Sequence, residues 1–262
     1  MPYKYYSQFE VARRAIFKAS KAVLEIYKTP DFGVQMKSDH SPVTKADLLS
    51  NKIIVDYLKE TYPDYGYLSE EFADDLSRLN KDFVWIIDPI DGTKDFIKRN
   101  DQFAINIALA YKGEIVLGLI MVPAKHELYY AFKGTHAYLE LNNEVIQIHT
   151  SKRRKNLIAI ESNEHYTDLD KDYLEKHNIK EIKRCGSAYK GCLIARGVAD
   201  LQIKIGGSSK EWDIAPIDII VTTAGGSFTR PNGERYTYNK KDVYNHSGYL
   251  IMNRNHAGMW LK

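Results

Sequence analysis

The segment Asp88-Pro89-Ile90-Asp91-Gly92-Thr93 places two carboxylates, a turn and a hydroxyl in close succession. It follows residues 83–87, a short apolar run rich in β-forming residues that is typical of a buried strand ending at Asp88. Pro89 stiffens the turn, and Asp91-Gly92 reverses the chain. Two carboxylates across such a turn can converge on one hard cation, and the Ile90 carbonyl between them can supply another oxygen ligand.

The residues after this turn suit a phosphate group. We expect the amides of Gly92 and Thr93 to open a short helix, where backbone N–H groups and a small hydroxyl can bind an oxyanion. Gly92 has no Cβ, so a phosphate can approach the backbone closely. Asp-Pro and Asp-Gly are also common turn dipeptides, and the alternative interpretation is an ordinary turn. The metal-site hypothesis is favoured because other acids fall where such a site needs them.

Three further acidic positions extend the pattern, and each has a structural alternative. Glu70-Glu71 follows the apolar stretch 65–68, and adjacent carboxylates repel unless they are solvated or share cations. Asp213 lies where a helix is expected to begin near Ile214, with Pro216 in its first turn, so it could be a plain N-cap. Asp47 follows Thr44 in a pattern that resembles a capping box, which serves helix stability alone.

Several motifs that mark other classes of enzyme are absent from the sequence. The sequence contains no G-x-x-x-x-G-K-[ST] loop, no G-x-G-x-x-G fingerprint and no H-E-x-x-H motif. Its eight histidines show no metal-ligand spacing, and Cys185 and Cys192 suggest buried thiols in a reducing compartment. Carboxylates and a hydroxyl favour Mg²⁺ over Zn²⁺ and phosphoryl transfer to water.

Composition sets the class of protein. The 262 residues are 44% hydrophobic and 27% charged, as in folded globular proteins, and can bury a sizeable core. The net charge of +3 is too small to indicate a nucleic-acid-binding protein, so the basic run 152–155 is interpreted as a solvated loop. No stretch has the apolar length of a membrane span, and Met1 to Arg14 carries no apolar signal core. We therefore expect a cytoplasmic location.

The order of expected elements predicts two subdomains. Residues 7–28 and a helix from Thr44 to near Tyr62 are amphipathic, and residues 103–148 resemble an antiparallel meander. Beyond the basic run, helices and strands alternate. They are strands at 157–161, 201–205 and 249–252 and helices at 169–177, 187–198 and 214–224. This pattern places helices on an antiparallel sheet in residues 1–150, with most metal ligands, and an α/β subdomain in residues 151–262, with Asp213 and substrate contacts.

Taken together, these motifs resemble the signature of the inositol monophosphatase superfamily of lithium-sensitive, Mg²⁺-dependent phosphatases. The resemblance rests on Asp47, Glu70-Glu71, residues 88–93 and Trp212-Asp213, and on Ala224-Gly225-Gly226 downstream. Within the superfamily, Lys94–Asn100 is similar to an extension of the bacterial CysQ branch, the 3′(2′),5′-bisphosphate nucleotidases. Residues 41–47, Gly186-Ser187 with Lys190, and residues 236–239 also resemble that branch.

The resemblance implies an α/β (α+β) fold, a five-layer α/β/α/β/α sandwich. The implied reaction removes the 3′-phosphate of adenosine 3′,5′-bisphosphate to give AMP, with two or three Mg²⁺ ions. The implied metal ligands are Glu70, Asp88, the Ile90 carbonyl, Asp91 and Asp213. The catalytic residues would be Thr93, Asp47 and Glu70, with Thr93 and Asp47 orienting the attacking water.

The resemblance also implies the substrate contacts, which are Glu70, Ile90, Asp91, Gly92, Thr93, Ser187, Lys190, Lys204 and Asp213, with His165 less directly matched. Lys204 stands where related enzymes carry Arg, which puts a bidentate grip on phosphate there in doubt. Inositol 1-phosphate and fructose 1,6-bisphosphate are alternative substrates for the same site. A catalytically idle phosphate-binding scaffold is a further alternative, but such a protein is expected to have lost at least one residue of a set that is complete here: Glu70, Asp88, Asp91, Thr93 and Asp213. We expect a monomer or homodimer whose partner is a small phosphate ester.

Overall fold

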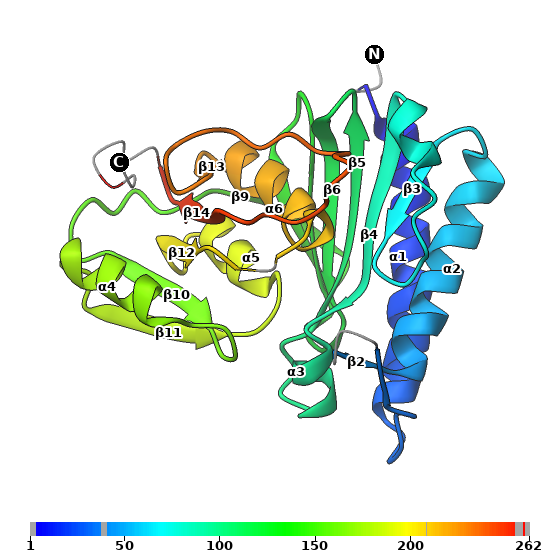
Figure 1. The fold of residues 1–262 in the computed structure, drawn as a ribbon, viewed down its shortest axis with the longest axis horizontal. Helices are drawn as coiled ribbons and strands as arrows, with labels where there is room; N and C mark the ends of the chain where they lie inside the picture. Colours follow the sequence, from blue (N-terminus) through cyan, green and yellow to red (C-terminus); the bar gives the residue numbers. More distant parts are fainter. Residues whose placement is uncertain (1–3, 38–40, 208, 255–258, 260–262) are drawn as a thin grey trace.

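A computed structural model describes residues 4–37, 41–207, 209–254 and 259. Its described elements form five layers (Figure 1). Helices α1 (Tyr6–Tyr27) and α2 (Lys45–Thr61) cover one face of a seven-stranded sheet, and α5 (Tyr189–Ala195) and α6 (Glu211–Thr223) lie between this sheet and a five-stranded one. Helix α4 (Asp168–Lys176) covers the far face of the second sheet. The expected α/β/α/β/α sandwich is therefore confirmed.

The larger sheet has the strand order β3-β4-β5-β6-β7-β8-β9. Its strands are β3 (Gly66–Ser69), β4 (Phe83–Asp91), β5 (Ala104–Tyr111), β6 (Glu114–Val122), β7 (Glu127–Phe132), β8 (Ala137–Leu141) and β9 (Glu144–Ile148). The strands from β5 to β9 form the expected antiparallel meander, and β4 adds to it antiparallel to β5. The sheet departs from expectation at β3, which runs parallel to β4 because residues 70–82 cross back instead of forming a hairpin.

The smaller sheet has the order β11-β10-β12-β14-β13. Its strands are β10 (Ile158–Ser162), β11 (Glu181–Cys185), β12 (Leu201–Ile205), β13 (Ser227–Thr229) and β14 (Gly248–Met252). A two-stranded ribbon of β1 (Gln35–Met36) and β2 (Pro42–Val43) precedes α2, and the short helix α3 (Thr93–Ile97) follows β4. The proposed division at residues 150 and 151 falls between β9 and β10, but α6 also packs against β4 to β7.

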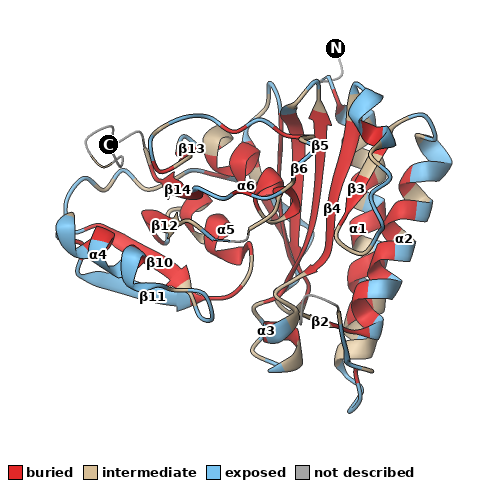
Figure 2. Cartoon of the chain, in the orientation of Figure 1, coloured by how far each residue is buried: buried red, intermediate tan, exposed pale blue. Residues whose placement is uncertain are grey.

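Three apolar clusters hold the layers together, and Figure 2 shows most of the larger sheet and of the central helices α5 and α6 coloured as buried. One lies between α1, α2 and the larger sheet, a second between the two sheets around α5 and α6, and a third beneath α4. None of the helices within the described ranges is long and apolar enough to cross a membrane.

Two expected boundaries near the acidic segment are wrong. Strand β4 does not end at Asp88 but continues to Asp91, with a bulge between these residues that the sequence pattern does not reveal. Helix α6 begins at Glu211, because the Asp213 carboxylate accepts the Lys210 N–H at 2.7 Å and caps the helix from its third position. Asp213 is therefore not the N-cap, and Pro216 lies beyond the first turn.

Candidate active site

The two strands that lead to the acidic motifs run side by side. Because β3 and β4 are parallel, with Ser69 paired to Ile87, the next residues Glu70 and Asp88 are neighbours at the point where β3 ends and β4 continues. Asp88 is 1% exposed and accepts a hydrogen bond from the Ile90 N–H at 3.1 Å. The bulge then turns Asp91 back toward the same point. Strand pairing and one local irregularity thus gather the acids.

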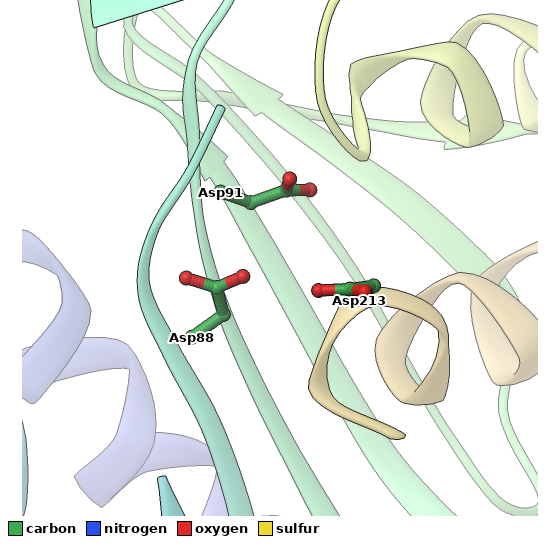
Figure 3. Close-up of side chains that lie close together, drawn as sticks. All are labelled: Asp88, Asp91 and Asp213. Carbon is green, nitrogen blue, oxygen red and sulfur yellow. The ribbon is translucent and has the colours of Figure 1, made fainter. Parts of the chain in front are cut away.

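Three carboxylates meet between the end of β4 and the start of α6 (Figure 3). Oxygen atoms of Asp88, Asp91 and Asp213 all lie within 4.8 Å of one another. The Asp91 Oδ2 atom accepts the Ala188 N–H at 2.6 Å and the Asn106 amide at 3.3 Å. The backbone and neighbouring side chains therefore hold each acid in a defined orientation.

The electrostatics of this cluster favour a bound cation. Burial, with the charges of Glu70, Asp91 and Asp213, raises the pKa of Asp88 well above its usual value. Burial and the charges of Asp91 and Glu70 do the same for Asp213. Burial raises the pKa of Asp91 to about 6, although Lys190 and the Ala188 N–H act in the other direction. A divalent ion would offset this repulsion, and an all-oxygen donor set fits a hard cation.

Glu70 lies outside this close group of three. Its Oε1 atom binds the Lys37 ammonium at 3.1 Å, and Glu71 binds the same nitrogen at 2.5 Å. Burial opposes the charge of Lys37, but Glu70 and Glu71 outweigh it and raise the pKa of Lys37 above its usual value. An internal cation thus balances the adjacent carboxylates, which is one of the two arrangements expected for them. The role of Glu70 as a metal ligand stays a prediction.

Thr93 and Asp47 are brought into direct contact. The Thr93 hydroxyl donates to Asp47 Oδ1 at 3.0 Å, and it also lies 3.3 Å from the Ile90 carbonyl. The other carboxylate oxygen of Asp47 accepts the Thr44 N–H at 2.8 Å, which completes a capping box for α2. Burial raises the pKa of Asp47 despite these hydrogen bonds. The capping and catalytic interpretations of Asp47 are therefore compatible in one side chain.

A cavity of about 310 Å³ connects the acidic cluster with the expected substrate residues. Among the predicted site residues, those lining it are Glu70, Asp88, Ile90, Asp91, Gly92, Thr93, His165, Ser187, Lys190, Lys204 and Asp213. Asp47 lies behind Thr93 and does not line it. The ammonium of Lys190, a residue only 7% exposed, donates to the Ser187 carbonyl at 2.7 Å, and that of Lys204 donates to the His165 carbonyl at 2.7 Å. The cavity therefore combines an acidic end with several cations.

The Lys94–Asn100 extension contributes its first two residues to the site. Lys94 and Asp95 line the cavity, and the buried Asp95 carboxylate accepts hydrogen bonds from the amides of Asn100 and Asn163. A Cβ on Gly186 would lie only 2.4 Å from this carboxylate, so a glycine is needed at that position. The extension thereby packs against the loop that carries Ser187.

Sequence reasoning missed three residues of the site. Lys37 contacts Glu70 and Glu71 from a segment without a recognisable motif. Glu161 is buried in the cavity wall, where burial raises its pKa to about 8 although the Ile203 N–H donates to it at 3.1 Å. Asn106, which contacts Asp91, did leave a signal, because it is a polar residue inside the otherwise apolar strand 104–110.

Comparison with known proteins identifies the family. A sequence profile described as the inositol monophosphatase family matches residues 6–260. The chain belongs to this family.

Within the inositol monophosphatase family, the chain is similar to proteins named 3′(2′),5′-bisphosphate nucleotidase CysQ. It is 32% identical to the protein of Escherichia coli K12 over 235 residues, which cover 89% of this chain and 94% of the relative. It is 34% identical to that of Buchnera aphidicola over 223 residues, 84% and 83% of the two chains. The crystal structure of CysQ from Bacteroides thetaiotaomicron superimposes with a TM-score of 0.83 at 34% identity, covering 96% of this chain and all of that one.

Proposed function

We propose that this protein is a Mg²⁺-dependent phosphomonoesterase that hydrolyses the 3′-phosphate of adenosine 3′,5′-bisphosphate to give AMP and phosphate. The observation that carries the proposal is the convergence of Asp88, Asp91 and Asp213 at one end of a cavity that Thr93 also lines. The similarity to the CysQ nucleotidases over most of the chain supports the choice of substrate.

The charges in the cavity support a substrate with two phosphates. Lys94, Lys190 and Lys204 line the same cavity as the acidic cluster, so ammonium groups lie within it as well as carboxylates. A second phosphate on the substrate would have cationic partners there, and charge-assisted hydrogen bonds to phosphate are the stronger kind. Inositol 1-phosphate has one phosphate, so it has no second anionic group for these lysines.

Five groups of this chain would act as metal ligands. Asp88, Asp91, Asp213, Glu70 and the Ile90 carbonyl would hold two or three Mg²⁺ ions. Bound Mg²⁺ supplies Lewis-acid activation of water and neutralises charge on the phosphoryl group and the leaving oxygen.

Thr93 is positioned to accept the proton of the attacking water. Its hydroxyl hydrogen is directed to Asp47 Oδ1, so its oxygen lone pairs are free to accept a hydrogen bond from the attacking water. As the water attacks phosphorus and the bond to the 3′-oxygen breaks, the water proton would pass to Thr93 Oγ1 while the Thr93 proton moves to Asp47, and the leaving 3′-oxygen would take a proton from solvent. The backbone amides of Gly92 and Thr93 would orient the phosphate oxygens.

The proposal is tested by measuring phosphate release from adenosine 3′,5′-bisphosphate, inositol 1-phosphate and fructose 1,6-bisphosphate side by side. Each is assayed with Mg²⁺, with a chelator, and with Mg²⁺ plus Li⁺. We expect the highest kcat/KM for the nucleotide, loss of activity with the chelator and inhibition by Li⁺. A preference for inositol 1-phosphate, or phosphate release that survives the chelator, would overturn the proposal.

A further inference from the structure

Asn106 is an unusual residue for its position. It is 0% exposed in the middle of β5, whose other residues are Ala, Ile, Leu and a terminal Tyr. In the antiparallel ladder it pairs with Asp88, so the two side chains project from the same face of the sheet. A buried amide in an apolar strand is costly unless it is hydrogen-bonded, and its partners therefore indicate why it is there.

The side-chain amide nitrogen of Asn106 has two acceptors. It lies 3.3 Å from Asp91 Oδ2 and 3.3 Å from the backbone carbonyl oxygen of Trp212. Both partners can only accept, so the two N–H groups face them and the amide orientation is determined. Asn106 Oδ1 has no hydrogen-bond partner among the described residues. One side chain on β5 therefore connects an acid at the end of β4 to the first turn of α6.

The Trp212 carbonyl is available because of Pro216. In a regular helix the carbonyl of residue 212 accepts the N–H of residue 216, but proline has no N–H. Helix α6 also packs closely on the sheet here, since a Cβ on Gly118 would lie 2.9 Å from the Pro216 Cα atom. Gly118 pairs with Ala108, two residues along β5 from Asn106. The missing helix bond and the close packing together place the free carbonyl at Asn106.

We propose that Asn106 is a positioning residue that sets the distance between Asp91 and the first turn of α6, which carries Asp213. This inference rests on the proposed function, because it assigns Asn106 to the same cation-dependent reaction. One hydrogen bond of Asn106 holds the Asp91 carboxylate, and the other holds the backbone next to Asp213. Support of the helix alone would need only the bond to the Trp212 carbonyl, whereas Asn106 also donates to Asp91.

A double-mutant cycle with Pro216 separates positioning from simple helix support. Asn106→Leu removes both hydrogen bonds and leaves the Trp212 carbonyl unpaired, which should lower Tm. Pro216→Ala supplies an N–H to that carbonyl and keeps the contact between Asn106 and Asp91. In the double variant the helix bond is restored, and only the Asp91 contact is missing. Each variant is examined by thermal unfolding without metal and by calorimetric titration with Mg²⁺ alone.

The expected result is that the double variant regains the Tm lost by Asn106→Leu but binds Mg²⁺ about 10- to 100-fold more weakly than Pro216→Ala, as is usual when partners of metal ligands are removed. Its kcat/KM should fall with the affinity. If the double variant binds Mg²⁺ as tightly as Pro216→Ala, Asn106 only supports the helix and the proposal is overturned. If Tm is not regained, the pairing with Trp212 is contradicted. The titration needs no substrate, so a wrong substrate assignment would not obscure either result.

Discussion

The Thr93 hydroxyl and the Asp47 carboxylate are joined by a 3.0 Å hydrogen bond, although 46 residues separate them in the chain. Asp47 holds the start of α2 with one oxygen and Thr93 with the other. A helix cap has therefore been placed where it also polarises a hydroxyl at the edge of the cavity. This relationship supports the proposal that Thr93 and Asp47 take part in proton transfer.

Replacing Thr93 by Ala should lower kcat for adenosine 3′,5′-bisphosphate by about 100-fold and leave Mg²⁺ affinity nearly unchanged, because the carboxylates remain. Steady-state kinetics and calorimetry measure the two effects. Thr44→Ala is the matched control, since it weakens the same cap by about 1 kcal/mol but retains the contact between Thr93 and Asp47. If Mg²⁺ affinity is what collapses in Thr93→Ala, Thr93 supports the site structurally.

Lys37 acts as an internal counter-ion that a divalent ion at Glu70 must compete with. Lys37→Gln should therefore lower the Tm of the metal-free protein and bind Mg²⁺ roughly 10-fold more tightly, because repulsion between Glu70 and Glu71 is no longer compensated. The shift of Tm on adding Mg²⁺ is the measurement. Lys45→Gln removes a lysine whose side chain is 66% exposed and should change neither quantity. A weaker response to Mg²⁺ in Lys37→Gln would contradict this account.

Lys204 should matter for the second phosphate of the substrate. Lys204→Met is expected to raise KM for adenosine 3′,5′-bisphosphate by about 10- to 100-fold, as one charge-assisted hydrogen bond is lost. The KM for inositol 1-phosphate should change little, because that substrate has no second phosphate. The comparison of the two KM values is the test, with Lys152→Met as a variant outside the cavity. An equal rise for both substrates would place Lys204 at the scissile phosphate.

Glu161 should give the protein a pH-dependent stability. Its pKa is about 8 in the folded protein and near 4.5 when unfolded, so the folded state binds the proton more tightly. The contribution is favourable below pH 4.5 and is lost as pH rises through 8, on the order of a few kcal/mol. Glu161→Gln should therefore raise Tm relative to wild type at pH 8.5, and this difference should shrink toward pH 5. A constant Tm difference across this range would contradict the assignment, and the exposed Glu164→Gln serves as control.

The local chemistry of the sequence was sufficient where neighbours in the chain determine the structure. An apolar run, a proline and Asp-Gly predicted a strand, a turn and a short helix around Asp88, and a capping pattern predicted the start of α2 at Thr44. The parallel pairing of β3 with β4 was not predictable in this way, because it depends on the path of residues 70–82. Strand β11 was missed because it lies at a sheet edge and is largely polar and exposed.

The site was predictable to a similar extent. Its carboxylates and Thr93 lie in recognisable sequence motifs. Lys37 and Asn106 contact residues far away in the chain, and no local motif reveals these contacts. The start of α6 was misplaced because Asp213 caps the helix from within its first turn, which the sequence allowed but did not require. Pro216 was consequently assigned to the first turn, and the free carbonyl that it creates at Trp212 could not be foreseen.

The central claim is that the carboxylates around Asp91 hold the cations that drive phosphate release. Asn has the size of Asp but one charge fewer, so Asp91→Asn should retain the fold, with a Tm at or above the wild-type value in the absence of metal. The decisive measurement is phosphate release from adenosine 3′,5′-bisphosphate by this variant and the wild type across a range of Mg²⁺ concentrations. The account predicts a loss on the order of 10³-fold that extra Mg²⁺ does not restore. A near wild-type rate in Asp91→Asn would contradict it.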